Sequence, residues 1–408
     1  MNGPSVDNPA AETHPADSPA LGLQAGLTRL MAAIGCSVVQ FWLAVPLTSL
    51  VLSHRGIGSG TIGLFAMTPW LAVLLLLPLM PRLVRQLGAM TVFRGGMIMG
   101  CAAMIVFMLT DNLAVWFAAN FLNGAGAALR WVVSDTLVIA AAPVLQRGRI
   151  LGIYETVLGG CLLAAPFLLS LTGSGGILPF AIAAALPLLA ILPTLGLKAP
   201  PLTMTDIRLT ELTGIVARYA LPLLTILLCG IVACSSYSLF PIYGRALGLS
   251  EREAALWMAV FGFGAVACQY AIGWLCDRWQ HDIVHRALIG LVTAGLLLLP
   301  ALDSGGPQLW MFGFFFGGAV TGLYTVTMYL SGSTARPGEL LPLIMAVTLF
   351  YTLGSIAGPV MAGWAMEILP PHGLPVSLAA ASLLVIAAML LLHRRPRPQA
   401  ALQGGPPQ

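Results

Sequence analysis

Charged residues are scarce in this sequence, because only 8% of its 408 residues are Asp, Glu, Lys or Arg. A soluble domain carries about 25%, and a soluble helical protein could not cover its surface with so few charges. Hydrophobic residues make up 58% of the chain, and its mean hydropathy is +0.91. The composition therefore predicts an all-α protein that crosses a membrane several times.

The sequence also lacks the motifs of energy-coupled pumps and metal proteins. There is no G-x-x-x-x-G-K-[ST] loop, and the single lysine is Lys198, which argues against an ATP-driven pump. The seven cysteines stand singly, with no CxxC pair, and are expected to be small packing residues. We place the six histidines in tails or loops, so we expect no metal and no cofactor.

Catalysis and nucleic-acid binding are not expected either. A membrane enzyme would need polar catalytic groups that converge near one interface. The nearest candidates, His281 and Asp282, are interpreted as loop charges. We therefore expect no enzyme activity and no nucleic-acid partner.

Long apolar stretches account for most of the chain. A spanning helix needs about 20 apolar residues, and reading between Gly, Pro and charged breaks predicts twelve such helices. The predicted spans are 27–52, 61–80, 91–110, 113–140, 149–172, 175–196, 217–243, 254–275, 286–302, 308–332, 341–366 and 374–392.

Basic residues fall mainly on one side of this arrangement. With both termini in the cytoplasm, fifteen of the nineteen Lys and Arg residues lie in cytoplasmic segments. The opposite side has only Arg55, Arg245 and Arg252, and Arg130 lies within the membrane. This bias supports an even number of helices, with both ends of the chain inside.

The chain divides into five regions. The first 20 residues have no Lys or Arg and therefore do not resemble a secretory signal. We expect disordered tails at 1–22 and 394–408, six-helix bundles at 23–197 and 217–393, and a cytoplasmic linker at 198–216.

The two bundles resemble each other in sequence. A shift of 194 aligns 121–137 with 315–331 and places Arg130 on Tyr324. A shift of 193 places "AAP" at 164–166 on "AGP" at 357–359, and a shift of 195 places Trp42 on Tyr237. Three similar offsets predict two tandem halves of the same fold.

The segment "GWLCDRW" at 273–279 resembles the loop signature of the major facilitator superfamily (MFS), Gly-x-Leu-x-Asp-Arg. Gly273, Leu275, Asp277 and Arg278 match it position by position. The resemblance implies two six-helix bundles that work by alternating access. It also implies a latch on the cytoplasmic side, where Gly273 permits close helix approach. The loop between helices 2 and 3 departs from the pattern, because Arg85 stands where the family has an acid.

In this superfamily helices 1, 4, 7 and 10 line a central cavity, so the resemblance implies that Arg130 and Tyr324 face it. Arg130 would anchor an anionic or hydrogen-bonding substrate, or partner an acid, because a charge within the membrane is costly. The alternative is a structural contact between helices. Further cavity candidates near the midplane are Gln40, Trp42, Tyr237, Thr321 and Thr325. Ser and Thr also serve as contacts between membrane helices.

Two acids lie deep in neighbouring helices. Asp135 is five residues after Arg130, about 140° around the helix, so the two do not form an i,i+4 pair. Glu155 lies at a similar depth on the next, antiparallel helix. Two such carboxylates would hold a proton readily, as a proton carrier must. Alternatively, each pairs with Arg147 or Arg149.

These features predict a monomeric twelve-helix transporter of the bacterial inner membrane, whose partners are a small solute, protons and lipid. We expect proton-coupled efflux of an amphipathic compound. The alternative is proton-coupled uptake of an anionic nutrient bound by Arg130. A sensor or receptor that shares the transporter fold is the alternative of another class.

Overall fold

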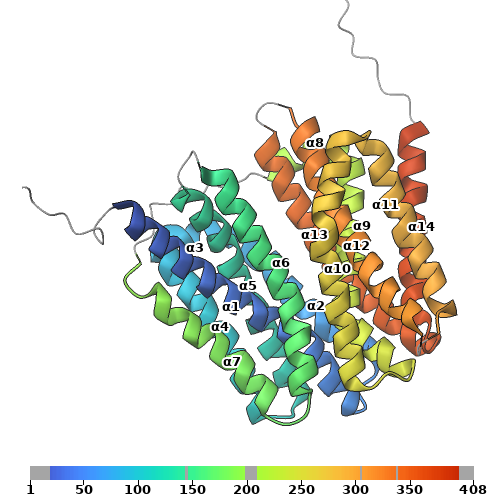
Figure 1. The fold of residues 1–408 in the computed structure, drawn as a ribbon, viewed down its shortest axis with the longest axis horizontal. Helices are drawn as coiled ribbons and strands as arrows, with labels where there is room; N and C mark the ends of the chain where they lie inside the picture. Colours follow the sequence, from blue (N-terminus) through green and yellow to red (C-terminus); the bar gives the residue numbers. More distant parts are fainter. Residues whose placement is uncertain (1–18, 143–145, 198–208, 304–305, 337–338, 395–408) are drawn as a thin grey trace, which may run out of the picture.

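The computed structural model describes residues 19–142, 146–197, 209–303, 306–336 and 339–394. Within these residues the secondary structure is helical, with no strand. Figure 1 shows two bundles side by side, the first formed by the N-terminal half of the chain and the second by the C-terminal half. The predicted all-α fold is confirmed.

Helices of the N-terminal half follow one another across the layer. They are α1 (Pro19–His54), α2 (Ser59–Leu76) continued by η2 (Leu77–Leu79) and α3 (Met80–Leu87), α4 (Ala89–Leu109), α5 (Leu113–Ala141), α6 (Arg147–Thr172), and α7 (Leu178–Ile191) continued by η4 (Leu192–Thr194).

The C-terminal half repeats this arrangement after a short helix, α8 (Leu209–Arg218). Its helices are α9 (Ala220–Ala246), α10 (Glu251–Arg278), α11 (His281–Leu298) continued by η5 (Leu299–Ala301), α12 (Pro307–Thr334), α13 (Leu340–Ile368) and α14 (Gly373–Arg394).

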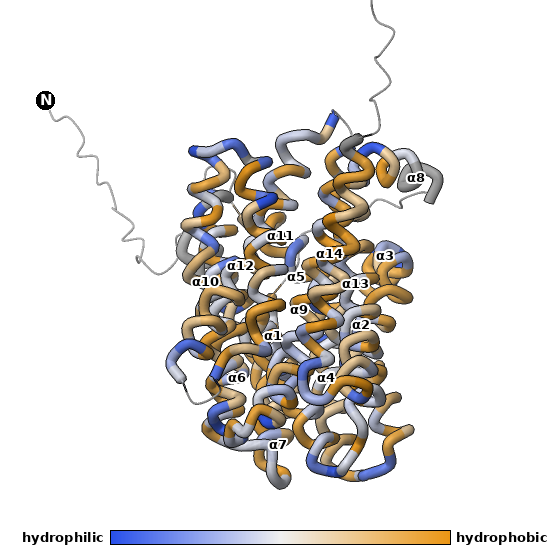
Figure 2. The backbone as a smooth tube through the Cα atoms, turned by 90° about the vertical axis from the view of Figure 1, so that its right-hand side faces the viewer, coloured by the Kyte–Doolittle hydropathy of each residue, from blue (hydrophilic) through white to orange (hydrophobic). Residues whose placement is uncertain are grey.

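The helices have the length and polarity of membrane spans. Eleven stretches in the described residues are long and apolar enough to cross a bilayer, and Leu178–Thr194 is a shorter apolar helix. Figure 2 shows polar residues gathered toward the two ends of the bundle, with apolar residues between them. The fold is thus a twelve-helix membrane fold of two six-helix bundles.

Local sequence explains where several helices begin. The Asn112 side chain accepts hydrogen bonds from the backbone of Ala114 and Val115 and so caps α5. Ser250 and Glu253 form a reciprocal capping box at the start of α10, with a Ser250 N to Glu253 Oε2 distance of 2.8 Å. These caps satisfy backbone N–H groups that a helix cannot satisfy itself.

Three details differ from the sequence prediction. Helix α1 begins at Pro19, inside the region expected to be a disordered tail. The predicted linker contains α8 over Leu209–Arg218, while 198–208 lies outside the described residues. The placement of every histidine in a tail or loop was wrong for His285, which is buried in α11 and lies 2.6 Å from the Thr225 hydroxyl. Both tails, 1–18 and 395–408, also fall outside the described part.

The two halves meet mainly through α2 with α13 and α6 with α10. Glycine permits these contacts: a Cβ on Gly63 would lie 2.2 Å from the Pro359 carbonyl oxygen, and one on Gly262 would lie 2.8 Å from that of Leu162. The halves lean apart toward the face that has α3 and α8, at the top of Figure 1. We call this the open face, and the opposite one the closed face.

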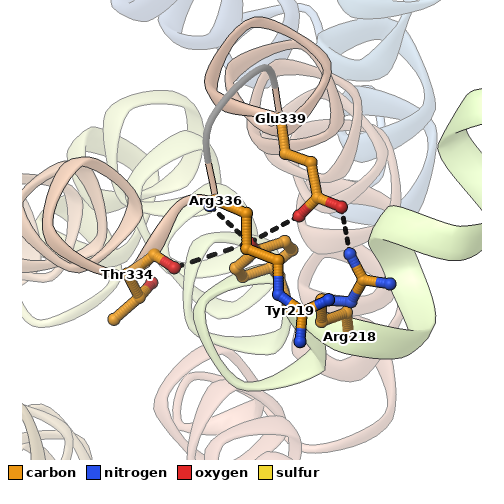
Figure 3. A network of polar contacts seen from close by, with 5 residues as sticks. All are labelled: Arg218, Tyr219, Thr334, Arg336 and Glu339. Atoms are coloured by element: carbon orange, nitrogen blue, oxygen red, sulfur yellow. Dashed lines mark hydrogen bonds and ion pairs between the residues drawn. The ribbon is translucent and has the colours of Figure 1, made fainter.

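A polar network ties the C-terminal half together at the open face (Figure 3). The Tyr219 hydroxyl donates to Glu339 Oε2 at 2.8 Å and accepts from the Arg336 backbone N–H at 3.1 Å. Arg218, at the end of α8, forms an ion pair with the same carboxylate. The network connects the start of α9 to the turn between α12 and α13.

We expect Gly63→Ala to lower thermal stability, because the new methyl group would collide with the Pro359 carbonyl and force α2 and α13 apart. Overpacking of this kind costs about 1–3 kcal/mol. Thermal unfolding of the purified protein measures it. Gly273→Ala is the matched control, because nothing lies within 4 Å of a Cβ at that position. Equal losses in both variants would contradict this account of the packing.

Acid should weaken the Figure 3 network. Hydrogen bonds from Tyr219 and Arg218 lower the pKa of Glu339 below its usual value of 4.5. The resulting stabilisation is full above that value and is lost as the pH falls through the lowered pKa. We expect Tyr219→Phe to reduce this acid-dependent loss, measured as the melting temperature at neutral and acidic pH. Glu339→Gln should abolish this part of the pH dependence. If Tyr219→Phe matches the unaltered protein at every pH, the network does not act in this way.

Candidate functional site between the halves

Arg130 lies inside the N-terminal half and not on the face toward the other half. Its side chain is buried, and its guanidinium donates to the carbonyls of Gly126 at 3.1 Å and Ser37 at 3.0 Å. It also donates to Gln40 Oε1 at 3.1 Å, and the Gln40 amide in turn donates to Asn123 at 3.0 Å. The expectation that Arg130 faces the central cavity is therefore not met in this conformation.

Small residues on α4 make this burial possible. A Cβ on Gly96 would lie 2.7 Å from Arg130 Cγ, and one on Gly100 would lie 2.9 Å from Gln40 Oε1. The cation therefore fits between α1, α4 and α5, where backbone carbonyls and an amide solvate it. Donation to several oxygens is how a buried guanidinium avoids most of its desolvation cost.

A pocket lies between the two halves. Its walls are formed by α1, α2, α5 and α9, and its empty space is about 330 Å³. Residues around it include Trp42, Trp70, Asn120, Cys234 and Tyr237. The rings of Trp42 and Tyr237, one from each half, are 4.5 Å apart. We call this the aromatic pocket.

Tyr237 is the one hydroxyl of this pocket without a partner among the described residues. Its side chain is 5% exposed, and its Oη has no hydrogen bond. A buried polar atom without a partner costs free energy. A ligand or water in the pocket would satisfy it.

Aromatic rings connect the pocket to the open side of the interface. Trp70 packs against Trp131 at a centroid separation of 6.3 Å and against Tyr351 of the other half at 5.7 Å. Tyr351 in turn packs against Tyr324 at 6.0 Å. Trp131 and Tyr324 are 43% and 38% exposed, so both keep accessible surface.

The two acids lie beyond Trp131. Asp135 accepts a hydrogen bond from the Tyr154 hydroxyl, and the Trp131 side chain is a further hydrogen-bond partner. Glu155 is exposed and within electrostatic range of Asp135. Tyr324 of the other half is within range of both carboxylates. We call Asp135 and Glu155 the acid pair; the structure places them near each other, as the sequence predicted.

No ion pair neutralises these acids among the side chains that the structure describes. Arg149 is exposed and makes no contact with either carboxylate in that set. The side chain of Arg147, the other alternative partner, lies outside the described residues. The acid pair therefore presents negative charge to the space between the halves.

Thr321 and Thr325 are held by their own half. Thr321 donates to the Gly317 carbonyl at 2.8 Å, and Thr325 donates to the Thr321 carbonyl at 3.3 Å. Bonds to the carbonyl four residues earlier are typical of such residues in helices. Of the cavity candidates, Trp42, Tyr237 and Tyr324 lie between the halves.

Polar contacts between the halves lie at the closed face. Glu367 Oε1 accepts from the Gly60 N–H at 2.9 Å, and the Ser59 hydroxyl donates to the Gly363 carbonyl at 2.9 Å. Glu251 accepts from the Ser174 N–H. Glu367 meets the N-terminus of α2, where a carboxylate is favoured. Two acids of the C-terminal half thus hold backbone N–H groups of the N-terminal half.

The expected latch residues are apart at the open face. Gly273 has open space around it, and Asp277 is exposed with no hydrogen bond or ion pair in the described part of the chain. The Arg278 guanidinium lies 5.6 Å above the Trp274 ring, and Arg85 is exposed on α3. The close approach expected at Gly273 is not made in this conformation.

Four aromatic residues of the site were not among the predicted site residues: Trp70, Trp131, Tyr154 and Tyr351. Two had a usable signal. Trp131 precedes Asp135 by one helical turn, and Tyr154 directly precedes Glu155. Trp70 was expected to be a packing or interface residue, and nothing in its sequence context distinguishes it from Trp116.

Family comparison finds the Major Facilitator Superfamily model over residues 223–408. An uncharacterized MFS-type transporter of Yersinia pestis is 25% identical over 373 residues, covering 88% of this chain and 94% of that protein. The uncharacterized MFS-type transporter YcaD of Escherichia fergusonii is 26% identical over 385 residues, covering 91% and 95%.

Solved structures share the fold. The nucleoside transporter NupG has a TM-score of 0.75 at 15% identity, covering 91% of this chain and 99% of that one. An inward-facing, unoccupied structure of a bacterial homologue of the human lysosomal transporter Spinster has a TM-score of 0.69 at 14% identity, with coverages of 90% and 95%.

We expect Arg130→Ala to destabilise the protein by about 3 kcal/mol, because it leaves a void and unpaired acceptors at Gln40 and Ser37. Thermal unfolding measures the loss, and Arg82→Ala, at an exposed position, is the control. Unchanged stability would contradict the structural role, and with loss of ligand binding it would restore Arg130 as a substrate anchor.

Proposed function

Because this chain belongs to the major facilitator superfamily, we propose that it is a secondary active transporter that moves a small organic solute by alternating access. The observation that carries the proposal is the asymmetry of the interface. Polar contacts join the halves at the closed face, through Glu367 and Glu251. The latch residues of the open face, such as Asp277, make no such contact in the described chain.

The open face would be cytoplasmic in this proposal. Several arginines lie toward it, including Arg85, Arg218 and Arg278, whereas Arg55 and Arg245 lie toward the closed face. Positive residues favour the cytoplasmic side. The relatives are bacterial, which supports a place in the inner membrane.

Proton-coupled efflux is the direction that the site supports best. The pocket and its aromatic extension suit an amphipathic solute, and the acid pair is placed to exchange protons with the open face. Uptake of an anionic nutrient loses its expected anchor, because the Arg130 guanidinium is directed into its own half.

Everted membrane vesicles that contain the protein test this function, with ethidium as an amphipathic dye. We expect an imposed proton gradient to drive dye accumulation, and dye addition to release protons. Asp135→Asn with Glu155→Gln should reduce both by about tenfold or more. Dye movement that ignores the gradient would contradict proton coupling, and no movement of ethidium or of protons would contradict efflux of this dye class.

The closed face can be tested separately. We expect Glu367→Ala to raise labelling of the pocket position Ser49→Cys by an impermeant thiol reagent on intact cells, in a background without native cysteines. Loss of one charge-assisted hydrogen bond predicts about a tenfold rise. Glu253→Ala is the matched control, because Glu253 bonds Ser250 within its own helix. Equal labelling in the two variants would show that Glu367 does not hold this face shut.

A further inference from the structure

We propose that the transported solute is an aromatic organic cation, whose rings occupy the aromatic pocket while its positive charge faces the acid pair. This inference rests on the proposed function and deepens it by naming the substrate class. It depends on three separate features of the interface: the shape and lining of the pocket, an unpartnered hydroxyl, and two carboxylates without a cationic partner in the described side chains.

The pocket selects for flat, polarisable groups. Trp42 and Trp70 line it from one half and Tyr237 from the other. Aromatic faces attract both other rings and cations, and each such contact contributes about 0.5–2 kcal/mol. A ring bound here would touch both halves, which couples binding to their relative position.

The unpartnered Tyr237 hydroxyl indicates a ligand. It is 5% exposed and lines the pocket without any hydrogen bond in the described residues. A bound solute with an amino, hydroxyl or carbonyl group would supply the missing partner. The same hydroxyl would leave a purely apolar solute with an unsatisfied polar atom beside it.

The acid pair lies one aromatic side chain away from the pocket. Trp70 lines the pocket and packs on Trp131, and Trp131 is a hydrogen-bond partner of Asp135. Glu155 lies beside Asp135, within electrostatic range of Tyr324 across the interface. A solute that fills the pocket and extends past Trp131 would therefore reach the carboxylates.

The nearest arginine in the sequence does not offset this charge. Arg130 adjoins Trp131, but its donors are directed to Ser37, Gln40 and Gly126 inside the N-terminal half. An anionic solute would meet two carboxylates and no cation in the described part of the site. Like charges in a partly dry site repel strongly, so the site discriminates against anions.

Tetraphenylphosphonium and tetraphenylborate test the sign of the charge, because they match in size and aromatic area and differ in charge. Equilibrium binding to the purified, detergent-solubilised protein is measured for both, with adenosine as a neutral aromatic control. We expect the phosphonium to bind at least tenfold more tightly than either. Preferential binding of tetraphenylborate or of adenosine would overturn the proposal, as would equal binding of all three.

Variants locate the binding. Asp135→Asn with Glu155→Gln should weaken phosphonium binding by about tenfold, and Trp70→Leu by about the same factor. Tyr237→Phe should leave phosphonium binding unchanged, because that cation has no hydrogen-bonding group. The same variant should weaken the binding of ethidium, which carries two amino groups, by a factor of about five. Melting temperatures of all variants exclude misfolding as the cause.

The outcome separates this inference from the proposed function. If Glu367→Ala opens the closed face but no probe prefers the positive charge, alternating access holds and the substrate class is wrong. If the phosphonium binds selectively in the pocket but no flux follows a proton gradient, the cation site holds and the coupled transport is wrong. Undiminished phosphonium binding in the acid-pair variant would also overturn the cation site.

Discussion

Burial of the Arg130 guanidinium within one half determines how the interface is lined. A cation in the bilayer must be solvated by the protein, and here the carbonyls of Ser37 and Gly126 and the amide of Gln40 do so. With that side chain directed inward, the geometry of α5 turns Trp131 and Asp135 to other faces of the helix. Trp131 then packs on Trp70, and Asp135 meets Tyr154.

The interface that results has two chemical parts and one closed end. Aromatic rings from both halves meet in its interior, and the acid pair lies beyond them toward the open face. Glu367 and Glu251 hold the opposite face through backbone N–H groups. Contacts of this kind can break and re-form, because they join rigid bundles through a few bonds and do not belong to either bundle's core.

Much of the fold could be predicted from residue patterns. Composition and apolar runs predicted the twelve helices, and the repeat predicted two halves. The repeat even indicated the residue that sequence reasoning missed. An offset of 193, the value that aligns "AAP" with "AGP", places Trp131 on Tyr324, and these two residues keep accessible surface in the structure. The offset of 194 instead selected Arg130, because a buried charge attracts attention more than a tryptophan does.

The sequence by itself determined that this chain spans a membrane, that it is built from two related bundles, and that Asp135 and Glu155 lie at one depth. Those properties follow from local composition and spacing along helices. Only the tertiary structure decided which way each side chain faces, because 100° of rotation per residue separates the interior of a bundle from its interface. The partners of Arg130, the meeting of Trp42 with Tyr237 and the join at Glu367 all depend on helices far apart in the chain, whose packing no local pattern specifies.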